Sequence, residues 1–312
     1  MGKVKIMKRK NALRIVSMVS CFVMALALCA CRGRDNETQT AENTPTENAT
    51  DATAGPNDVV TYPVPDGYRL VWSDEFDEDV LDMTNWNYEV HMPGWVNHEL
   101  QSYVINEENI YVKDGCLVIQ PLKNGNRYTS GRINTKSKHD FTYGIIEARI
   151  KVPQGKGFLP AFWMMPTDEK TYGPWPSCGE IDIMEVLGAA TKTTYSTIHY
   201  GTPHTLNQEK FRLSEGSFSS EYHVFRCEWL PGKITFSVDG VEFYTTDTWF
   251  TQKDGVAYDE FPAPFNRDFY IILNVAVGGD WPGDPNESTV FDERAAMYVD
   301  YVRVYQNDSI SK

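Results

Sequence analysis

Residues 179–187 read GEIDIMEVL and place three carboxylates in an otherwise apolar run. An ionised carboxylate buried without a partner is costly, so these acids must face water, a cation or a substrate. In a regular strand alternate residues share a face, which puts Glu180 and Asp182 together. Glu185 follows Glu180 by five positions and would point into the core. One extra residue near Ile183, a β-bulge, would return Glu185 to the face of the other acids. We therefore predict a bulged strand.

Two Asp-Gly dipeptides predict tight β-hairpins, because Asp-Gly between alternating runs is typical of two-residue turns. They are Asp114-Gly115, between residues 109–113 and 116–120, and Asp239-Gly240, between residues 234–238 and 241–244. In the second hairpin Ile234 and Phe236 alternate with Thr235 and Ser237. We expect one dry face and one wet face there.

Many short strands and no long helical periodicity favour an all-β fold, an antiparallel β-sandwich of the jelly-roll type. Further strands are expected at residues 68–72, 144–151, 158–165, 180–187, 194–200, 222–230, 269–277 and 297–305. Residues 93–103 have poor periodicity and are expected to form a loop. The folded domain should span residues 62–306, followed by a tail at 307–312.

The N-terminal region has the pattern of an export signal. Residues 1–30 combine a basic start with an apolar run and end before Cys31 in a motif that resembles a bacterial lipobox. We predict a lipoprotein signal peptide with Cys31 lipidated; the alternative is an ordinary secretory signal with an incidental cysteine. Residues 31–61 are polar and acidic, which predicts a disordered tether. The expected location is the bacterial cell envelope, lipid-anchored to a membrane, at the outer membrane or cell surface.

Net charge limits the possible binding partners, and the cysteine content limits the possible disulfides. The chain has a formal charge of −14, and without residues 1–30 the charge is −20 because that segment holds six basic and no acidic residues. Such a surface disfavours nucleic acid. Cys116, Cys178 and Cys227 could form one disulfide or remain three free thiols. We expect a monomer.

Paired carboxylates are the general requirement for glycoside hydrolysis: one protonates the leaving oxygen and the other attacks or activates water. Glu180 and Glu185 could supply this pair. Asp182 between them would push their pKa values apart. A cation site or a solvated face is the alternative interpretation of the three acids.

Aromatic and polar residues could complete a sugar-binding cleft, because indole faces stack on the C–H faces of sugar rings. The tryptophan candidates are Trp95, Trp163, Trp175 and Trp281, with core packing as the alternative, whereas Trp72, Trp86 and Trp229 are expected in the core. His199 could donate to a substrate hydroxyl or to the nucleophile, or be a structural histidine. The other polar candidates are Asn97, Glu99, Gln101, Arg132 and Asn274.

Residues 175–188, WPSCGEIDIMEVLG, resemble the active-site strand of glycoside hydrolase family 16, in its laminarinase-like branch. Other segments look like family segments in the family's order: NHELQSY, YGIIEARIKVPQGKGFLPAFWMMP, TIHYG, YIILNVAVGGDWPG and VDYVRVYQ. The resemblance covers nearly all of residues 66–306. One departure is Leu159, where the family usually has an aromatic residue.

The resemblance implies a concanavalin A-like sandwich with a concave substrate cleft. It implies a retaining mechanism with Glu180 as nucleophile, Glu185 as general acid/base and Asp182 assisting, and no cofactor for catalysis. Trp163, Trp175, His199 and Arg132 match positions that line the family's cleft. A structural calcium ion is implied near Glu75, Gly115 and Asp300.

The expected activity is endo-hydrolysis of β-1,3-glucan, mixed-linkage β-1,3/1,4-glucan or both, with the glucan as partner. Three alternatives remain at this point. They are a hydrolase similar to agarases or carrageenases, a transglycosylase, and a non-catalytic β-glucan-binding module.

Overall fold

The computed structural model describes residues 62–252 and 259–310. The predicted signal peptide, Cys31 and tether, residues 1–61, lie outside this part of the chain. Within it, every regular element is a β-strand except one short 3₁₀ turn, η1 (Glu293–Ala295). No helix in the described residues has the length and apolar character to span a membrane. The all-β prediction is confirmed.

The first sheet has eight strands in the order β17-β16-β15-β10-β19-β5-β4, and β1 also pairs with β19. The strands are β1 (Tyr68–Asp74), β4 (Ile110–Lys113), β5 (Cys116–Ile119), β10 (Gly144–Lys151), β15 (His223–Leu230), β16 (Lys233–Val238), β17 (Val241–Thr246) and β19 (Met297–Asn307). Both predicted Asp-Gly hairpins are present, as β4–β5 and β16–β17.

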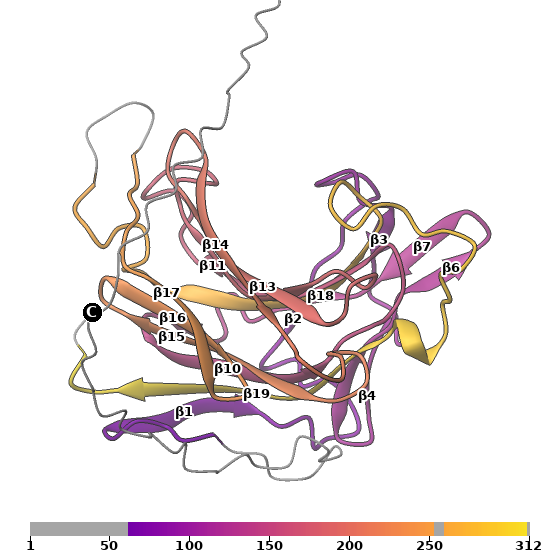
Figure 1. Ribbon diagram of the computed structural model, residues 1–312, viewed down its shortest axis with the longest axis horizontal. Helices are drawn as coiled ribbons and strands as arrows, with labels where there is room; N and C mark the ends of the chain where they lie inside the picture. Colours follow the sequence, from indigo (N-terminus) through magenta and orange to yellow (C-terminus); the bar gives the residue numbers. More distant parts are fainter. Residues whose placement is uncertain (1–61, 253–258, 311–312) are drawn as a thin grey trace, which may run out of the picture. The chain divides into compact units, whose positions relative to one another are not determined.

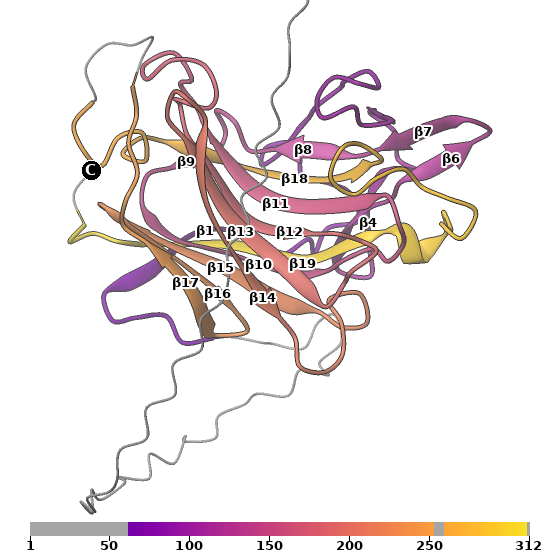
Figure 2. The same cartoon turned by 45° about the horizontal axis from the view of Figure 1, so that its top comes forward.

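The second sheet also has eight strands, in the order β14-β13-β12-β11-β18-β8-β2, with β9 paired to β18. They are β2 (Asn87–Tyr88), β8 (Arg132–Asn134), β9 (Asp140–Phe141), β11 (Phe158–Pro166), β12 (Glu180–Val186), β13 (Thr193–Tyr200), β14 (Thr205–Arg212) and β18 (Phe269–Val277). Figure 1 shows this sheet lying over the first and curving away from it, and Figure 2 shows its strands more nearly face-on.

A small third sheet joins β3 (Gln101–Tyr103), β7 (Arg127–Ser130) and β6 (Leu122–Asn124). The strands β3 and β7 are parallel, in contrast to the antiparallel pairs of the two large sheets. The prediction of a loop over residues 93–103 is therefore wrong at its end. A strand of three residues is too short to show a period of two in its sequence.

The core lies between the two large sheets. Alternate residues such as Ile146 and Ile150 of β10, and Ile181 of β12, are fully buried in one apolar cluster. Trp86 and Trp229 are completely buried, as predicted. Trp72 is only half-buried and packs against the edge of this cluster.

The prediction of a wet face on the β16–β17 hairpin is wrong. Thr235 is 5% exposed and Ser237 is 8% exposed. The Thr235 hydroxyl meets the Thr245 hydroxyl at 3.0 Å across the strands, so burial leaves it with a hydrogen-bond partner. Small hydroxyl side chains can therefore occupy a covered face that composition alone assigns to solvent.

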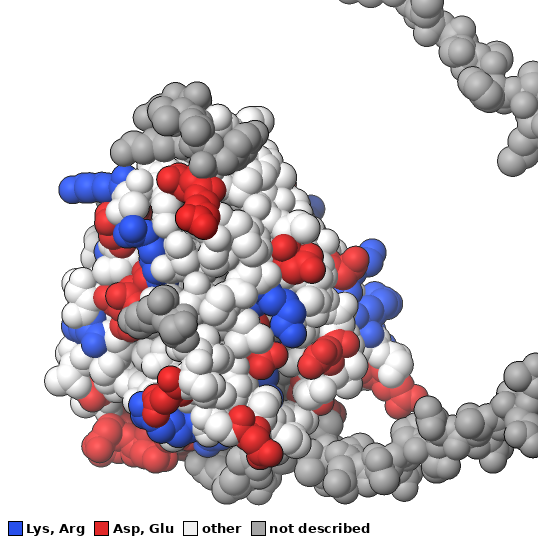
Figure 3. Space-filling model, turned by 90° about the vertical axis from the view of Figure 1, so that its left-hand side faces the viewer, with Lys and Arg blue, Asp and Glu red and all other residues white. Residues whose placement is uncertain are grey.

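The excess negative charge is not gathered into one region on the face in Figure 3. Acidic and basic side chains are interspersed there, with uncharged surface between them. Elsewhere in the described chain, exposed ion pairs such as Arg69 with Asp308 at 2.9 Å also bring opposite charges together. Such a surface presents no extended field of one sign on this face.

Candidate active site

The predicted bulge is present in β12 at Ile183. Along β11 the register passes from Met184 directly to Asp182, which leaves Ile183 unpaired on that side. Along β13, Ile183 and Met184 together face Ser196. The Ser196 hydroxyl donates to the carbonyl oxygen of Ile183 at 2.7 Å and so holds the extra residue in place. Both apolar side chains are buried, and the bulge turns the three acids to the opposite side of the strand.

The acids lie in a groove on the outer side of the second sheet. Two adjoining cavities, of about 660 and 400 Å³, share Asn97, Trp175 and Glu180. The larger cavity extends from Glu180 toward Trp163, and the smaller one extends toward Glu185. Glu180 therefore stands where the two halves of the groove meet.

Glu180 begins β12 and is half-buried. Burial, followed by the negative charge of Asp182, raises its pKa to about 8. Two neighbours oppose this rise: His199, and the indole of Trp175, whose Nε1 donates to Glu180 Oε2 at 2.6 Å. The nucleophile candidate therefore has groups beside it that stabilise its ionised form.

Asp182 is 3% exposed, and its Oδ2 atom has no hydrogen-bond partner in the described chain. His199 Nε2 lies 3.2 Å from this oxygen but not in hydrogen-bond geometry. Burial raises the pKa of Asp182 to about 7, whereas its hydrogen bond with Glu180 lowers it. On the other side of the imidazole, His199 Nδ1 lies 2.8 Å from His204 Nε2.

Glu185, the third acid, has only neighbours that raise its pKa. Burial, and then the charges of Asp182, Glu180 and Glu99, raise its pKa well above the ordinary value. Each of these influences favours the protonated form, in contrast to the mixed influences on Glu180. The charges of these neighbouring carboxyls oppose one another's ionisation, and only Glu180 of the two glutamates has neighbours that lower its pKa. Glu180 is therefore the glutamate placed to ionise, and Glu185 is the one placed to keep its proton.

This proton affinity has a consequence for stability. An unfolded Glu185 ionises near 4.5, whereas the folded carboxyl stays protonated to higher pH. Its contribution to stability is therefore present below that value and is lost as the pH rises toward the folded-state pKa. We expect Glu185→Gln to melt above the wild type at about pH 8 and level with it at about pH 4. Each kcal/mol gained should raise the midpoint by about 2–4 °C.

Calorimetry at both pH values checks this prediction. Glu209→Gln, at an exposed position on the edge strand β14, is the matched control and should leave the melting temperature unchanged at both. Equal midpoints for Glu185→Gln and the wild type at about pH 8 would contradict the raised pKa.

Trp175 gives a second test, of catalysis. Trp175→Phe removes the N–H that lowers the pKa of Glu180. The acidic limb of the kcat/KM profile should move to higher pH by about one unit, since a hydrogen bond to a charged group is worth about 1.5–3 kcal/mol and one unit corresponds to about 1.4 kcal/mol. Trp281→Phe, whose ring contacts Tyr195, is the control and should leave the limb in place. A limb that stays fixed in Trp175→Phe would refute this role.

The larger half of the groove contains three predicted residues in one stack. The Arg132 guanidinium lies 5.1 Å from the Trp95 ring centre and 4.7 Å from that of Trp163. Glu89, which sequence reasoning missed, accepts from Arg132 Nε at 2.6 Å and orients it. Asn274 is buried and accepts from Trp163 Nε1 at 2.7 Å, so it helps to fix the orientation of the indole.

The smaller half brings together the remaining candidates. Trp281 is 41% exposed, and its ring meets Tyr195 edge-on at 5.1 Å between centres. Glu99 lines this half and accepts from buried Gln101 at 2.7 Å. The Gln101 side chain also accepts from the Val277 backbone N–H, which gives it a structural role. Sequence reasoning missed Tyr195, His204 and Gln208 on this wall.

The residues proposed for calcium do not fit a cation site. Arg303 forms hydrogen bonds with both carboxylate oxygens of Glu75, at 2.9 and 2.7 Å. Arg149 binds Asp300 at 2.8 Å. Each carboxylate already has its own positive partner, and Gly115 contributes only a turn of the β4–β5 hairpin. Among the described residues, one group of acids and histidines is close enough to share a metal ion. It consists of Glu180, Asp182 and His199.

Of the two alternatives for the cysteines, the described chain shows free thiols rather than a disulfide. The three thiols, all buried, are those of Cys116, Cys178 and Cys227.

Two carboxylic acids with raised pKa values, in an open groove lined by indole rings, form the kind of site that glycoside hydrolases use. Comparison with known proteins identifies the family of the chain. The model of "Glycosyl hydrolases family 16" matches residues 96–302, and the chain belongs to this family.

Two curated relatives are a glucan endo-1,3-beta-glucosidase A1 of Niallia circulans and a beta-glucanase of Rhodothermus marinus. The first is 39% identical over 272 residues, covering 79% of this chain and 39% of that protein. The second is 37% identical over 249 residues, covering 77% and 85%. The chain thus spans about two fifths of the length of the first relative and most of the second.

Among solved structures, the laminarinase catalytic domain of Thermotoga maritima MSB8 superimposes with a TM-score of 0.65 at 39% identity. The match covers 77% of this chain and 98% of that one. It agrees with the concanavalin A-like jelly roll expected from the sequence.

Proposed function

We propose that this protein is a retaining endo-β-glucanase that hydrolyses internal bonds of β-1,3-glucan, mixed-linkage β-1,3/1,4-glucan or both. The observation that carries the proposal is the bulge at Ile183, because it brings Glu180 and Glu185 to one groove, where only Glu180 has neighbours that lower its pKa. The groove continues on both sides of Glu180, so a polymer could lie across it with sugars on each side.

The reaction proceeds in two displacements. Glu185 gives its proton to the glycosidic oxygen as Glu180 attacks the anomeric carbon, which breaks the glycosidic bond and forms a glycosyl ester on Glu180. Glu185, now ionised, takes a proton from water, and that water displaces Glu180 from the anomeric carbon. Two inversions leave the product with the β configuration of the substrate.

The neighbouring residues assist each step. Asp182 and His199 adjoin Glu180 and tune its charge through the reaction. Trp175 donates to Glu180 and exposes its ring to the groove, where it can stack on the sugar bound there. Arg132 and Trp163 would hold sugars in the larger half, and Trp281 would hold them in the smaller half.

A product assay tests the proposal. The purified protein is incubated with laminarin, mixed-linkage β-glucan, agarose and carrageenan, and the released oligosaccharides are separated. We expect soluble oligosaccharides from one or both glucans and none from the galactans. Release from agarose or carrageenan alone would favour the galactan-hydrolase alternative. Binding to glucan with no release of reducing ends would favour a binding module.

We also propose that Cys31 is lipidated and anchors the protein as a monomer at the cell envelope. The support is the sequence alone: the basic and apolar residues 1–30, the lipobox-like motif and the acidic segment 31–61. Cells fed a labelled fatty acid should yield labelled wild-type protein and unlabelled Cys31→Ala. Label retained in Cys31→Ala would refute the anchor.

A further inference from the structure

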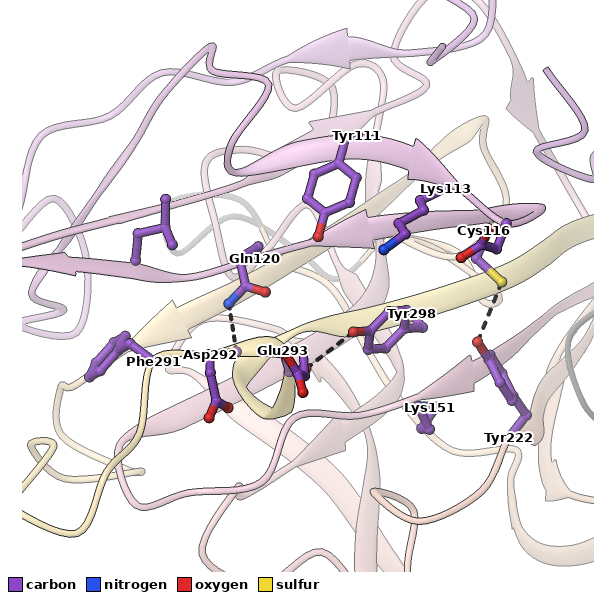
Figure 4. A pocket seen from close by; sticks show the side chains of 12 residues that line it. Tyr111, Lys113, Cys116, Gln120, Lys151, Tyr222, Phe291, Asp292, Glu293 and Tyr298 are labelled. Carbon is purple, nitrogen blue, oxygen red and sulfur yellow. Dashed lines mark hydrogen bonds between the residues drawn. The ribbon is translucent and has the colours of Figure 1, made fainter. Parts of the chain in front are cut away.

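A second pocket lies on the face of the sandwich opposite the groove. Its volume is about 640 Å³, and we call it the outer pocket. Figure 4 shows its lining, which comes from the β4–β5 hairpin, β19, the segment around η1 and the residues beside β10 and β15. The acids of β12 lie on the outer side of the other sheet, so the core separates the two sites.

Strand register explains why aromatic and charged side chains meet in the outer pocket. Leu117 and Ile119 of β5 point into the core, so their neighbour Val118 points outward. Val118 pairs with Tyr111 of β4 on one side and with Tyr298 of β19 on the other. The two tyrosines therefore flank one position on the outer surface of the sheet.

The same row continues onto β10, where Lys151 pairs with Tyr298. Lys151 Nζ lies 4.5 Å from the ring centre of Tyr298 and 5.4 Å from that of Tyr222. Tyr298 donates its hydroxyl to the carbonyl oxygen of Glu293 at 3.2 Å. These contacts hold the Tyr298 ring at the pocket, with the Lys151 ammonium over the ring (Figure 4).

The segment before η1 forms the other wall and is fastened to the hairpin. Buried Gln120 donates to the carbonyl oxygen of Asp292 at 2.9 Å. Asp292 caps η1 and pairs with Arg294 at 2.6 Å. Phe291 adds a further ring to this end of the pocket. The wall is therefore a built part of the structure that presents an aromatic ring and polar groups together.

The chemistry of this lining favours a neutral hydroxylated ligand. Rings offer flat apolar area, which suits the C–H faces of sugars. Lys113 and Lys151 stand with three acids, Asp114, Asp292 and Glu293, so charges of both signs are present. An ion of one sign gains little from such a mixture, whereas sugar hydroxyls both donate and accept hydrogen bonds.

We propose that the outer pocket is a second carbohydrate-binding site, which takes a segment of the same neutral β-glucan that the groove cleaves. This inference rests on the proposed function for the identity of the sugar. A site on the opposite face would hold the enzyme on an insoluble polymer while the groove acts on a neighbouring chain. Binding through two sites raises the effective concentration of polymer at the groove.

Binding stoichiometry tests the proposal, in the inactive Glu180→Gln background so that the probe is not consumed. A short β-1,3-linked gluco-oligosaccharide should occupy two sites by titration calorimetry. Adding Tyr111→Ala and Tyr298→Ala should leave one. Tyr111→Phe with Tyr298→Phe keeps both rings and should retain two sites. Tyr111→Ala alone, on the edge strand β4, should weaken the second site and serves if the double variant misfolds.

Activity supplies a second measurement. In the active enzyme, the paired alanine changes should lower hydrolysis of insoluble β-1,3-glucan by roughly 5- to 10-fold and leave hydrolysis of the soluble oligosaccharide unchanged. Val241→Ala, at an exposed position on β17 of the same sheet, is the matched control.

One site in the protein with intact tyrosines, or two sites in the paired alanine variant, would overturn the proposal. Equal loss on soluble and insoluble substrates would also count against it, because a site remote from the acids should spare the short substrate. If the proposed function itself is wrong, the result differs, because the wild-type protein then cleaves neither substrate.

Discussion

In Glu180→Ala the kcat on β-glucan should fall by more than ~10²–10⁴-fold, which is the usual contribution of a general acid–base. Without this carboxylate no glycosyl ester can form, and neither displacement takes place. The half-buried position of Glu180 and its 2.6 Å hydrogen bond from Trp175 place a fixed, ionisable oxygen at the centre of the groove. The measurement is kcat on laminarin, with substrate binding followed separately to confirm that the groove is intact.

Azide provides the control for this variant. The small anion can enter the space left by the Glu180 side chain and attack the anomeric carbon directly. Because only one displacement then occurs, the product should be the α-glycosyl azide. A β-glycosyl azide from Glu180→Ala would mean that another residue is the nucleophile.

Glu185→Ala should lower kcat on β-glucan by roughly 10²–10⁴-fold, because the leaving sugar then departs without a proton. A dinitrophenyl β-glycoside of a glucan oligosaccharide needs little protonation, so its first displacement should be nearly as fast as in the wild type. The glycosyl ester should then accumulate, since no base activates water. Burst kinetics with this substrate measure both steps.

Glu209→Ala is the matched control, because it removes an exposed acid from β14, the edge strand of the same sheet. Its rates should equal those of the wild type on both substrates. If Glu185→Ala slowed the dinitrophenyl glycoside as much as the polymer, Glu185 would not be the proton donor.

The bulge could be predicted from sequence because it follows from an odd spacing. Glu185 stands five positions after Glu180, and only an extra residue keeps both acids out of an apolar core. The Asp-Gly hairpins could also be predicted from sequence, because the Asp-Gly signal is local and does not depend on distant contacts. Predicting the bulge required only the two-residue period of a strand and the cost of burying charge, and predicting the hairpins required only the turn dipeptide.

Other features depend on contacts that a single sequence does not reveal. Edge strand β14, Thr205–Arg212, is polar on both faces and carries no apolar alternation strong enough to mark it. Glu89 orients Arg132 from 43 positions away, and His204 reaches His199 from the loop after β13. The calcium residues were implied by resemblance. The arginines that neutralise two of them come from strands that are distant in sequence but adjacent in the sheet.

The site also illustrates a conflict between stability and activity. Three carboxyls with pKa values raised by burial cost the folded protein stability at neutral pH. Asp182 keeps an oxygen without a hydrogen-bond partner in the described chain. Buried polar atoms of this kind are rare in proteins, and a catalytic role is one reason for retaining them. The same burial that lowers stability keeps Glu185 protonated for its role as an acid.

The central claim is that Glu180 and Glu185 face one groove across the bulge and hydrolyse a β-glucan with retention. Proton NMR of the first product formed from a β-1,3-glucan oligosaccharide tests it most directly, because the anomeric signals are read before mutarotation. We predict that the β-anomer appears first and the α-anomer grows only afterwards. An α-anomer formed first would mean inversion and would contradict the assignment of Glu180 as nucleophile.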